Sequence, residues 1–145
     1  MSQSIGTTDR EDGIFHMLHR AEQRAKMLFA DEAKGLDLTV RQLVILSVVS
    51  KHDGLMQTDI VRLTGIDRST VTELIGRMAN RGLLTRSRNQ RDARAYVVQV
   101  SELGAERLRE AEDASKRAGE RFLAALPDAQ RVDFVEGRQR AADIV

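Results

Sequence analysis

The sequence contains no cysteine, no tryptophan and only one proline in 145 residues. The absence of cysteine excludes disulfide bonds, thiolate metal sites and thiol-based redox sensing. No run approaches the roughly 18 apolar residues that a membrane helix requires, and the N-terminal MSQSIGTTDREDG lacks the basic-then-apolar order of a signal peptide. We therefore expect a cytoplasmic protein that has no membrane partner.

The signatures of catalysis are also missing. The sequence has no phosphate-binding glycine loop, no nucleophile elbow and no H-E-x-x-H motif. Acidic neighbours such as Glu112 and Asp113 fall on a predicted helix, where adjacent residues do not face one another. We expect no enzymatic activity, no catalytic residue and no cofactor.

What the sequence does contain fits one globular domain over residues 1–145, with 41% hydrophobic residues and a net charge of +1. The charge is unevenly distributed. Residues 67–101 carry seven basic and three acidic side chains, whereas the segments on either side have a slight acidic excess. A local basic excess is more informative about a partner than the total, because it marks one surface.

Hydrophobic spacing and capping residues predict most of the helices. Apolar residues three to four apart predict a helix over about 11–33, and Thr39 with Gln42 forms a capping box before a second, mostly buried helix. Ser101 is expected to cap a long fifth helix that ends at Pro127. The remaining helices are expected at 57–63, 68–81 and 128–145.

Two short predicted helices, 57–63 and 68–81, are separated by a tight turn at 64–67. This layout is that of a helix-turn-helix. Asp67 is positioned to cap the second helix, whose apolar stripe would hold it on the core. The stripe consists of Val71, Leu74, Ile75 and Met78.

A β-hairpin follows directly, with predicted strands at 83–88 and 94–100 around a polar tip. Together these elements predict a mainly α fold, a winged helix-turn-helix with a two-stranded β wing. The winged-helix region would cover about residues 55–100.

The exposed first turn of the second short helix and the hairpin carry side chains suited to DNA. Hydroxyl and guanidinium groups can bond phosphates or base edges without bulk, and four hairpin arginines against one acid indicate a polyanionic partner. There are simpler interpretations. The hydroxyl residues can be ordinary first-turn residues of a helix, and the charged hairpin can be solvated without binding a partner. The candidate DNA-binding residues are Arg68, Ser69, Thr70, Thr72, Arg77, Arg86, Arg88, Asp92 and Arg94.

The stretch DRSTVTELIGRMANRGLLTRSRNQRDARAYVVQVSELG resembles the recognition helix and wing of the multiple antibiotic resistance regulator (MarR) family. Its Asp92-Ala93-Arg94 resembles the family's D-x-R wing tip, and the segment from Val100 to Gly104 resembles its L-T-x-x-G signature. Ala93 stands where many relatives have a second arginine, and Ser101 replaces the usual threonine.

This resemblance implies a mainly helical dimer whose terminal helices, about 11–34 and 102–145, interlock. It also implies that Arg94 enters a DNA minor groove and that Asp92 holds it in place. Many relatives are repressors released by phenolic or aromatic acids, so the resemblance implies a sequence-specific repressor with a small-molecule effector. The missing cysteine excludes the family's peroxide-sensing branch.

The distribution of apolar residues independently favours a homodimer. Both ends of the chain carry more apolar side chains than a small central motif can cover, and a two-fold partner is the usual solution. Such a dimer would present two recognition helices about 34 Å apart to an inverted-repeat operator. The apolar residues are Phe15, Phe29, Phe122, Phe134 and Val135.

The first helix offers a candidate effector site. His16 and Arg20 are four residues apart on one face, close to His19. In MarR relatives the effector pocket lies where the first, second and fifth helices meet, so these residues and Arg41 are the candidate ligand-binding residues. They can equally be solvated or lie in a dimer interface. A zinc ion on the two histidines would need further ligands that the sequence does not identify, so we expect no metal.

A winged helix can also serve as a protein-docking module without DNA specificity, because a fold alone does not fix function. A docking surface is expected to be more apolar than the candidate face here. Its arginines are Arg68, Arg77, Arg86, Arg88 and Arg94.

Overall fold

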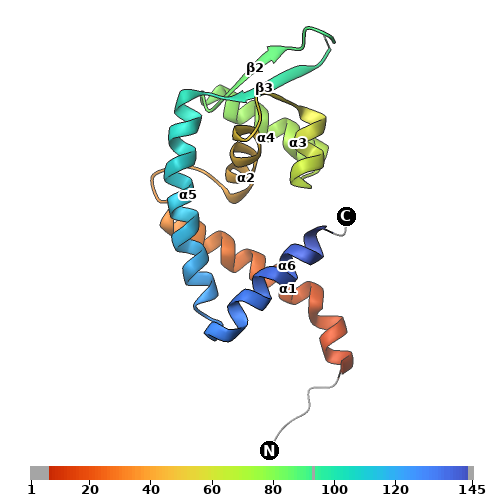
Figure 1. Ribbon diagram of the computed structural model, residues 1–145, viewed down its shortest axis with the longest axis vertical. Coiled ribbons are helices and arrows are strands. Elements are labelled where there is room, and N and C mark those ends of the chain that lie inside the picture. Colours follow the sequence, from red (N-terminus) through yellow and green to blue (C-terminus); the bar gives the residue numbers. More distant parts are fainter. Residues whose placement is uncertain (1–6, 93, 144–145) are drawn as a thin grey trace, which may run out of the picture. The chain divides into compact units, whose positions relative to one another are not determined.

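The structure is a computed structural model that describes residues 7–92 and 94–143. Within these ranges the chain forms six helices and one three-stranded antiparallel sheet (Figure 1). The helices are α1 (Thr7–Glu32), α2 (Val40–Ser50), α3 (Gln57–Thr64), α4 (Arg68–Asn80), α5 (Glu102–Leu123) and α6 (Asp128–Asp143). The strands are β1 (Leu55–Met56), β2 (Leu84–Arg88) and β3 (Tyr96–Val100). No helix in the described ranges is long and apolar enough to cross a membrane.

The chain divides into two compact units. Residues 33–115 form the winged-helix unit, which holds α2, α3, α4, the sheet and the first part of α5. Residues up to 32 and from 116 onward form the terminal-helix unit, which holds α1, α6 and the last part of α5.

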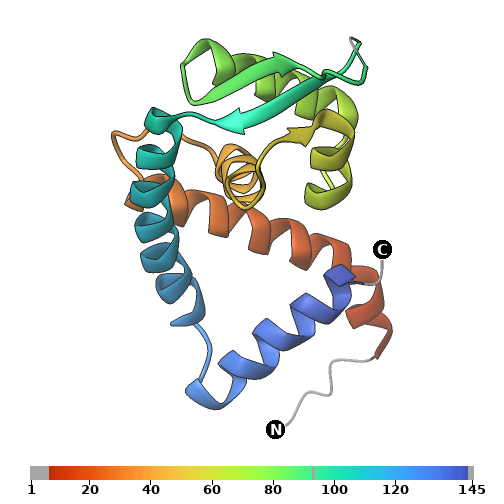
Figure 2. The same cartoon turned by 45° about the horizontal axis from the view of Figure 1, so that its top comes forward.

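The core of the winged-helix unit is built around α2. This helix is apolar on nearly every side, and Ile45 and Leu46 are completely buried. Figure 2 shows α2 end-on beneath the sheet. The other fully buried large side chains of this unit come from α2 itself, α3, α4 and β3, and they are Val49, Ile60, Val71, Ile75, Met78 and Val98.

Capping residues define the helix ends where the sequence predicted them. The Thr39 hydroxyl accepts a hydrogen bond from the N–H of Gln42, whose side chain accepts one from the Thr39 N–H, which confirms the capping box. Gly65 ends α3 with φ of 70°, a left-handed conformation that glycine adopts without a steric cost. These local signals fix the turn between α3 and α4.

The two-stranded wing is confirmed, and β1 is a third strand that the sequence analysis missed. Leu55 pairs with Val98 and Met56 with Val97, so β3 lies between β1 and β2. A strand of two residues is too short for a visible alternation of polar and apolar positions. Its existence depends on a partner more than 40 residues away in the sequence.

Several predicted boundaries differ from the structure. Helix α1 begins at Thr7, earlier than expected, and α5 ends at Leu123 instead of reaching Pro127. Residues 124–126 form a tighter turn, in which the Leu126 N–H donates to the carbonyl oxygen of Leu123 at 2.9 Å. Helix α6 begins at Asp128 as expected, while positions 144–145 of that prediction lie outside the described residues.

Ion pairs join α1 to the end of α5 in the terminal-helix unit. The Arg117 Nε atom lies 2.9 Å from Glu32 Oε2, and an Arg121 nitrogen lies 2.7 Å from Asp31 Oδ2 and 3.1 Å from Glu32 Oε1. The hydrogen bond from Arg117 lowers the pKa of Glu32, and the carboxylates of Asp31 and Glu32 raise the pKa of Arg121. These partly exposed ion pairs hold the end of α1 beside the last part of α5.

The apolar residues expected at a dimer interface fall into two groups. Phe29 is buried, and the rings of Phe122 and Phe134 pack with centroids 6.0 Å apart. Phe15 is 80% exposed, and Val135 is 44% exposed. Further exposed apolar side chains of this unit are Ile14, Met17, Leu18, Met27 and Val132.

Candidate nucleic-acid interface

Helix α4 has one buried face and one exposed face, as its hydrophobic spacing predicts. Val71, Ile75 and Met78 are buried, which anchors the helix on the core of the winged-helix unit. Leu74 is half-buried. The exposed side of the helix carries five of its polar residues, Arg68, Ser69, Thr72, Glu73 and Arg77.

Asp67 organises the first turn of α4. One of its carboxylate oxygens, Oδ1, accepts the Thr70 N–H at 2.9 Å and the Ser69 hydroxyl at 2.7 Å. The other, Oδ2, accepts the Thr70 hydroxyl at 2.7 Å. Led by the bond from the Thr70 N–H, these hydrogen bonds lower the pKa of Asp67 from its ordinary 3.8 to about 2. The predicted cap is therefore confirmed and holds two further hydroxyl groups.

Thr72 joins α4 to α3. Its hydroxyl donates to the carbonyl oxygen of Arg68 at 2.8 Å and accepts a short hydrogen bond from the Gln57 side-chain amide. Gln57 is the first residue of α3, and the sequence analysis did not single it out. Only the crossing of the two helices brings residues 57 and 72 together, so no local pattern could have revealed the contact.

The wing tip is closed by two side-chain acceptors. Asp92 Oδ1 accepts the N–H of Arg94 at 3.0 Å, and Asn89 Oδ1 accepts the N–H of Arg91 at 2.9 Å. Asp92 thus holds the backbone of Arg94, which leaves the guanidinium group free to extend. Ala93, which also belongs to the tip, lies outside the described residues.

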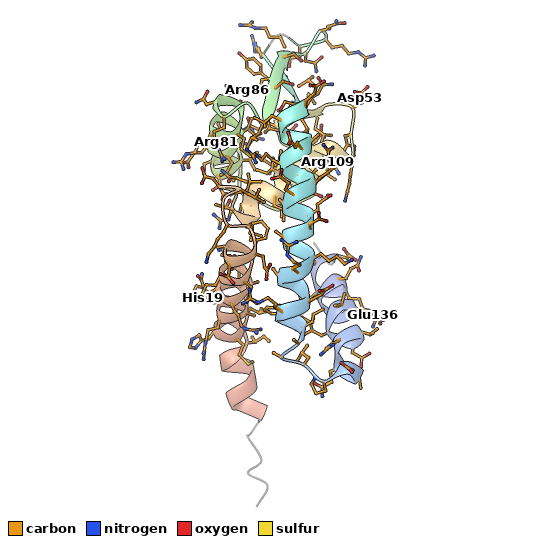
Figure 3. All side chains as sticks on the ribbon, turned by 90° about the vertical axis from the view of Figure 1, so that its left-hand side faces the viewer. His19, Asp53, Arg81, Arg86, Arg109 and Glu136 are labelled. Atoms are coloured by element: carbon orange, nitrogen blue, oxygen red, sulfur yellow. The ribbon has the colours of Figure 1, made fainter. Side chains whose placement is uncertain are left out.

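The arginines of this face differ in their electrostatic surroundings. Arg77 forms an ion pair with Glu73 at 2.6 Å, one turn away on α4. Among the residues that the structure describes, no carboxylate pairs with the side chains of Arg68, Arg86, Arg88, Arg91 or Arg94. All five are exposed, and Figure 3 labels Arg86 on the hairpin. The face therefore presents uncompensated positive charge on α4, on strand β2 and on the loop between the two wing strands.

A compact junction fixes the hairpin to the start of α5. The Ser101 N–H donates to the carbonyl oxygen of Leu83 at 3.1 Å, and its hydroxyl donates to the carbonyl oxygen of Gly82. The same hydroxyl caps α5 by accepting the N–H of Gly104 at 3.0 Å, as predicted. A Cβ atom on Gly104 would lie only 2.0 Å from the Leu83 carbonyl oxygen, so the close approach requires glycine.

This arrangement, a recognition-type helix beside a basic wing, agrees with known proteins. The sequence model of the MarR family matches residues 36–95, which include α2, α3, α4 and the hairpin up to its tip. Over this segment the chain is similar to the MarR family. It is accordingly a winged-helix, DNA-binding transcriptional regulator, and the resemblance seen in the sequence is confirmed.

Individual relatives extend the similarity beyond the winged helix. The HTH-type transcriptional repressor NicR of Pseudomonas putida is 27% identical over 86% of this chain and 78% of its own length. The BpsR regulator of Bordetella bronchiseptica, whose DNA binding is regulated by 6-hydroxynicotinic acid, superposes with a TM-score of 0.81 at 27% identity over 89% of this chain and 98% of its own. The PcaV regulator of Streptomyces coelicolor, solved with its natural ligand, superposes with a TM-score of 0.84. It is 26% identical, and the match covers 97% of this chain and 99% of its own.

The four candidate ligand-binding residues are all exposed. His16, His19 and Arg20 follow one another along α1, and Figure 3 labels His19 on that helix. Arg41 lies in the first turn of α2, in the winged-helix unit. None of the four has an ion pair or side-chain hydrogen bond to another described residue. Their role in ligand binding stays a prediction.

Proposed function

We propose that this MarR-family regulator is a homodimeric repressor that binds an inverted repeat in double-stranded DNA and is released by a small aromatic acid. The observation that carries DNA binding is the set of five exposed arginines on α4 and the hairpin without a carboxylate partner in the described chain. Elsewhere in the winged-helix unit, arginines such as Arg62, Arg81 and Arg107 pair with acids. A protein-docking surface would be more apolar.

The hydrogen bonds of Asp67 at the start of α4 and of Asp92 at the wing tip support separate tasks for α4 and the wing. In the proposed complex the first turn of α4 enters the major groove, where Arg68, Thr70 and Thr72 face base edges. The wing lies beside it, and Arg94 reaches into the minor groove from the backbone that Asp92 holds. Ser69 lies in the same first turn of α4 and is a further proposed contact. The remaining proposed contacts, mainly to phosphates, are Arg77, Arg86 and Arg88.

Exposed apolar side chains in the terminal-helix unit support the dimer. Phe15, Met27 and Val132 are 80%, 72% and 63% exposed, respectively. Leaving three such side chains in water is unfavourable, and a second copy can cover them around a two-fold axis. The same axis would relate two winged-helix units and thereby match an inverted repeat.

The relatives support the ligand class. BpsR is regulated by 6-hydroxynicotinic acid, a hydroxylated heteroaromatic acid, and NicR is a repressor. A carboxylate ligand needs a cationic partner, and Arg20 offers an exposed guanidinium without a carboxylate partner in the described part of α1. We propose that Arg20 binds the ligand carboxylate, with His16, His19 and Arg41 as further candidates.

The DNA-binding proposal is tested by selecting sites from a random duplex library and titrating the enriched sequence across a salt series. Arg94→Ala should weaken binding to selected and unrelated DNA alike and should reduce the salt slope by about one phosphate contact. Arg109→Ala is the charge-matched control, because Arg109 is exposed on α5 and belongs to neither α4 nor the hairpin. Wild-type affinity of Arg94→Ala at every salt concentration would refute the role of the wing.

The ligand proposal is tested with 6-hydroxynicotinic acid as the probe. It should weaken binding to the selected DNA, and linkage requires that DNA weaken ligand binding by the same factor. Arg20→Ala should lose the response to the ligand and keep DNA affinity, while Arg109→Ala should keep both. A ligand that binds equally well with and without DNA in calorimetry would not be the effector.

A further inference from the structure

Three hydroxyl groups in the first turns of α4, on the exposed Ser69 and Thr72 and the half-buried Thr70, share one property. Each donates its proton to an acceptor within the protein. The hydroxyls of Ser69 and Thr70 both donate to the Asp67 carboxylate at 2.7 Å. The Thr72 hydroxyl donates to the carbonyl oxygen of Arg68 at 2.8 Å. A hydroxyl has a single proton and two lone pairs, so after these bonds only lone pairs remain for a partner outside the protein.

The direction of these bonds is fixed by the chemistry of their acceptors. The carbonyl oxygen of Arg68 has no proton to give, so the proton between it and Thr72 belongs to the hydroxyl. The Asp67 carboxylate accepts three hydrogen bonds, which lower its pKa to about 2 and keep it ionised at neutral pH. Both hydroxyls facing it must therefore be the donors.

A surface of hydroxyl acceptors selects its partners in DNA. Phosphate oxygens, the N7 and O6 atoms of guanine, and the O4 atom of thymine are all acceptors and cannot bond to it. In the major groove only the exocyclic amino groups of adenine (N6) and cytosine (N4) donate hydrogen bonds. Thr72 retains one free lone pair, because Gln57 occupies the other.

We propose that Ser69, Thr70 and Thr72 recognise the exocyclic amino groups of adenine or cytosine in the operator and do not bind its phosphates. Arg68 lies in the same turn, and its guanidinium group can only donate hydrogen bonds. It would therefore bind the acceptor atoms of guanine or of a phosphate. The inference deepens the proposed DNA-binding function and rests on it. It replaces the wider expectation from the sequence, in which the same hydroxyls could serve either phosphates or bases.

The test uses the duplex enriched by site selection and removes single groups from it. Purine in place of adenine, or 2-pyrimidinone in place of cytosine, deletes an amino group. A 5-methyl-2-pyrimidinone in place of thymine deletes O4, and a methylphosphonate removes a phosphate charge. Each modified duplex is titrated against the wild-type protein and against Ser69→Ala, Thr70→Val and Thr72→Val.

Deleting the recognised amino group should weaken wild-type binding about 3- to 10-fold, the value of one hydrogen bond, and should have less than about a 2-fold effect on the variant that lacks its partner hydroxyl. Deleting O4 or a phosphate charge should affect wild type and variants equally. The Thr70→Ser and Thr72→Ser proteins keep the hydroxyl and should behave like the wild type. Circular dichroism checks that each variant folds, and three independent positions guard against one that does not.

The inference would be overturned if any hydroxyl deletion coupled to O4 or to a phosphate instead of an amino group, or if none of the three coupled to any deleted group. If selection enriched no sequence at all, the proposed function itself would fail. The two failures are therefore distinguishable, because the first occurs in a protein that still binds its selected site.

Discussion

Replacing Gly104 by alanine should destabilise the winged-helix unit. The new Cβ atom would lie 2.0 Å from the Leu83 carbonyl oxygen, about 1 Å closer than the 3.0 Å that real Cβ atoms respect, and 3.0 Å from a Val100 methyl group. The Leu83 oxygen belongs to the backbone and cannot rotate away. Relief requires the start of α5 to move, which breaks the Ser101 bonds to Gly82 and Leu83.

We expect a net loss of about 2–4 kcal/mol in the free energy of unfolding. Two hydrogen bonds at about 1 kcal/mol each and overpacking of about 1–3 kcal/mol oppose a helix-propensity gain of up to about 1 kcal/mol. Urea unfolding followed by circular dichroism measures the change, at one protein concentration because an oligomer's stability depends on it.

Gly76→Ala is the matched control for this measurement. Gly76 is the other helical glycine of the winged-helix unit, and a Cβ atom there meets nothing within 4 Å. We expect Gly76→Ala to stabilise the protein by about 0.5–1 kcal/mol, since alanine favours a helix more than glycine does. If Gly104→Ala were as stable as Gly76→Ala, the close approach of α5 to Leu83 would be wrong.

Two further predictions concern the cap of α4 and the dimer. Asp67 has a pKa lowered to about 2, so its contribution to stability is fully present above about pH 4 and is lost as the pH falls through 2. The stability difference between the wild type and Asp67→Asn should therefore shrink from pH 5 to pH 2, and a constant difference in urea titrations would contradict this. Phe15→Glu should weaken dimerisation in sedimentation experiments without loss of helix content, because the ring is 80% exposed in one subunit. If Phe15→Glu dimerised as strongly as the wild type, the proposal that this part of α1 lies in the dimer interface would be wrong.

Much of the winged helix could be predicted because its signals are local. Thr39, Asp67 and Ser101 act on N–H groups three residues away, and Gly65 ends its own helix, so each cap can be recognised within a few residues of sequence. The buried stripe of α4 repeats with the helical period. The excess of arginine in the hairpin is visible without knowing which groups surround it.

Some features depend on residues that are distant in sequence, and no local pattern could show them. Strand β1 exists only because β3 lies beside Leu55, and Gln57 reaches Thr72 only because α3 and α4 cross. The same holds for the contact that makes Gly104 necessary, which involves a carbonyl group 21 positions earlier.

The sequence by itself determined the order of the helices, their caps and the location of the positive charge, because helical period, capping and charge are properties of neighbouring residues. It also showed that Ser69, Thr70 and Thr72 lie at the start of the second helix of the motif. Only the tertiary structure decided where Gln57 meets the hydroxyl of Thr72 and which arginines have no nearby acid. The physical reason is that a hydrogen bond or an ion pair requires two groups within a few ångströms, and for residues far apart in sequence folding alone sets that distance.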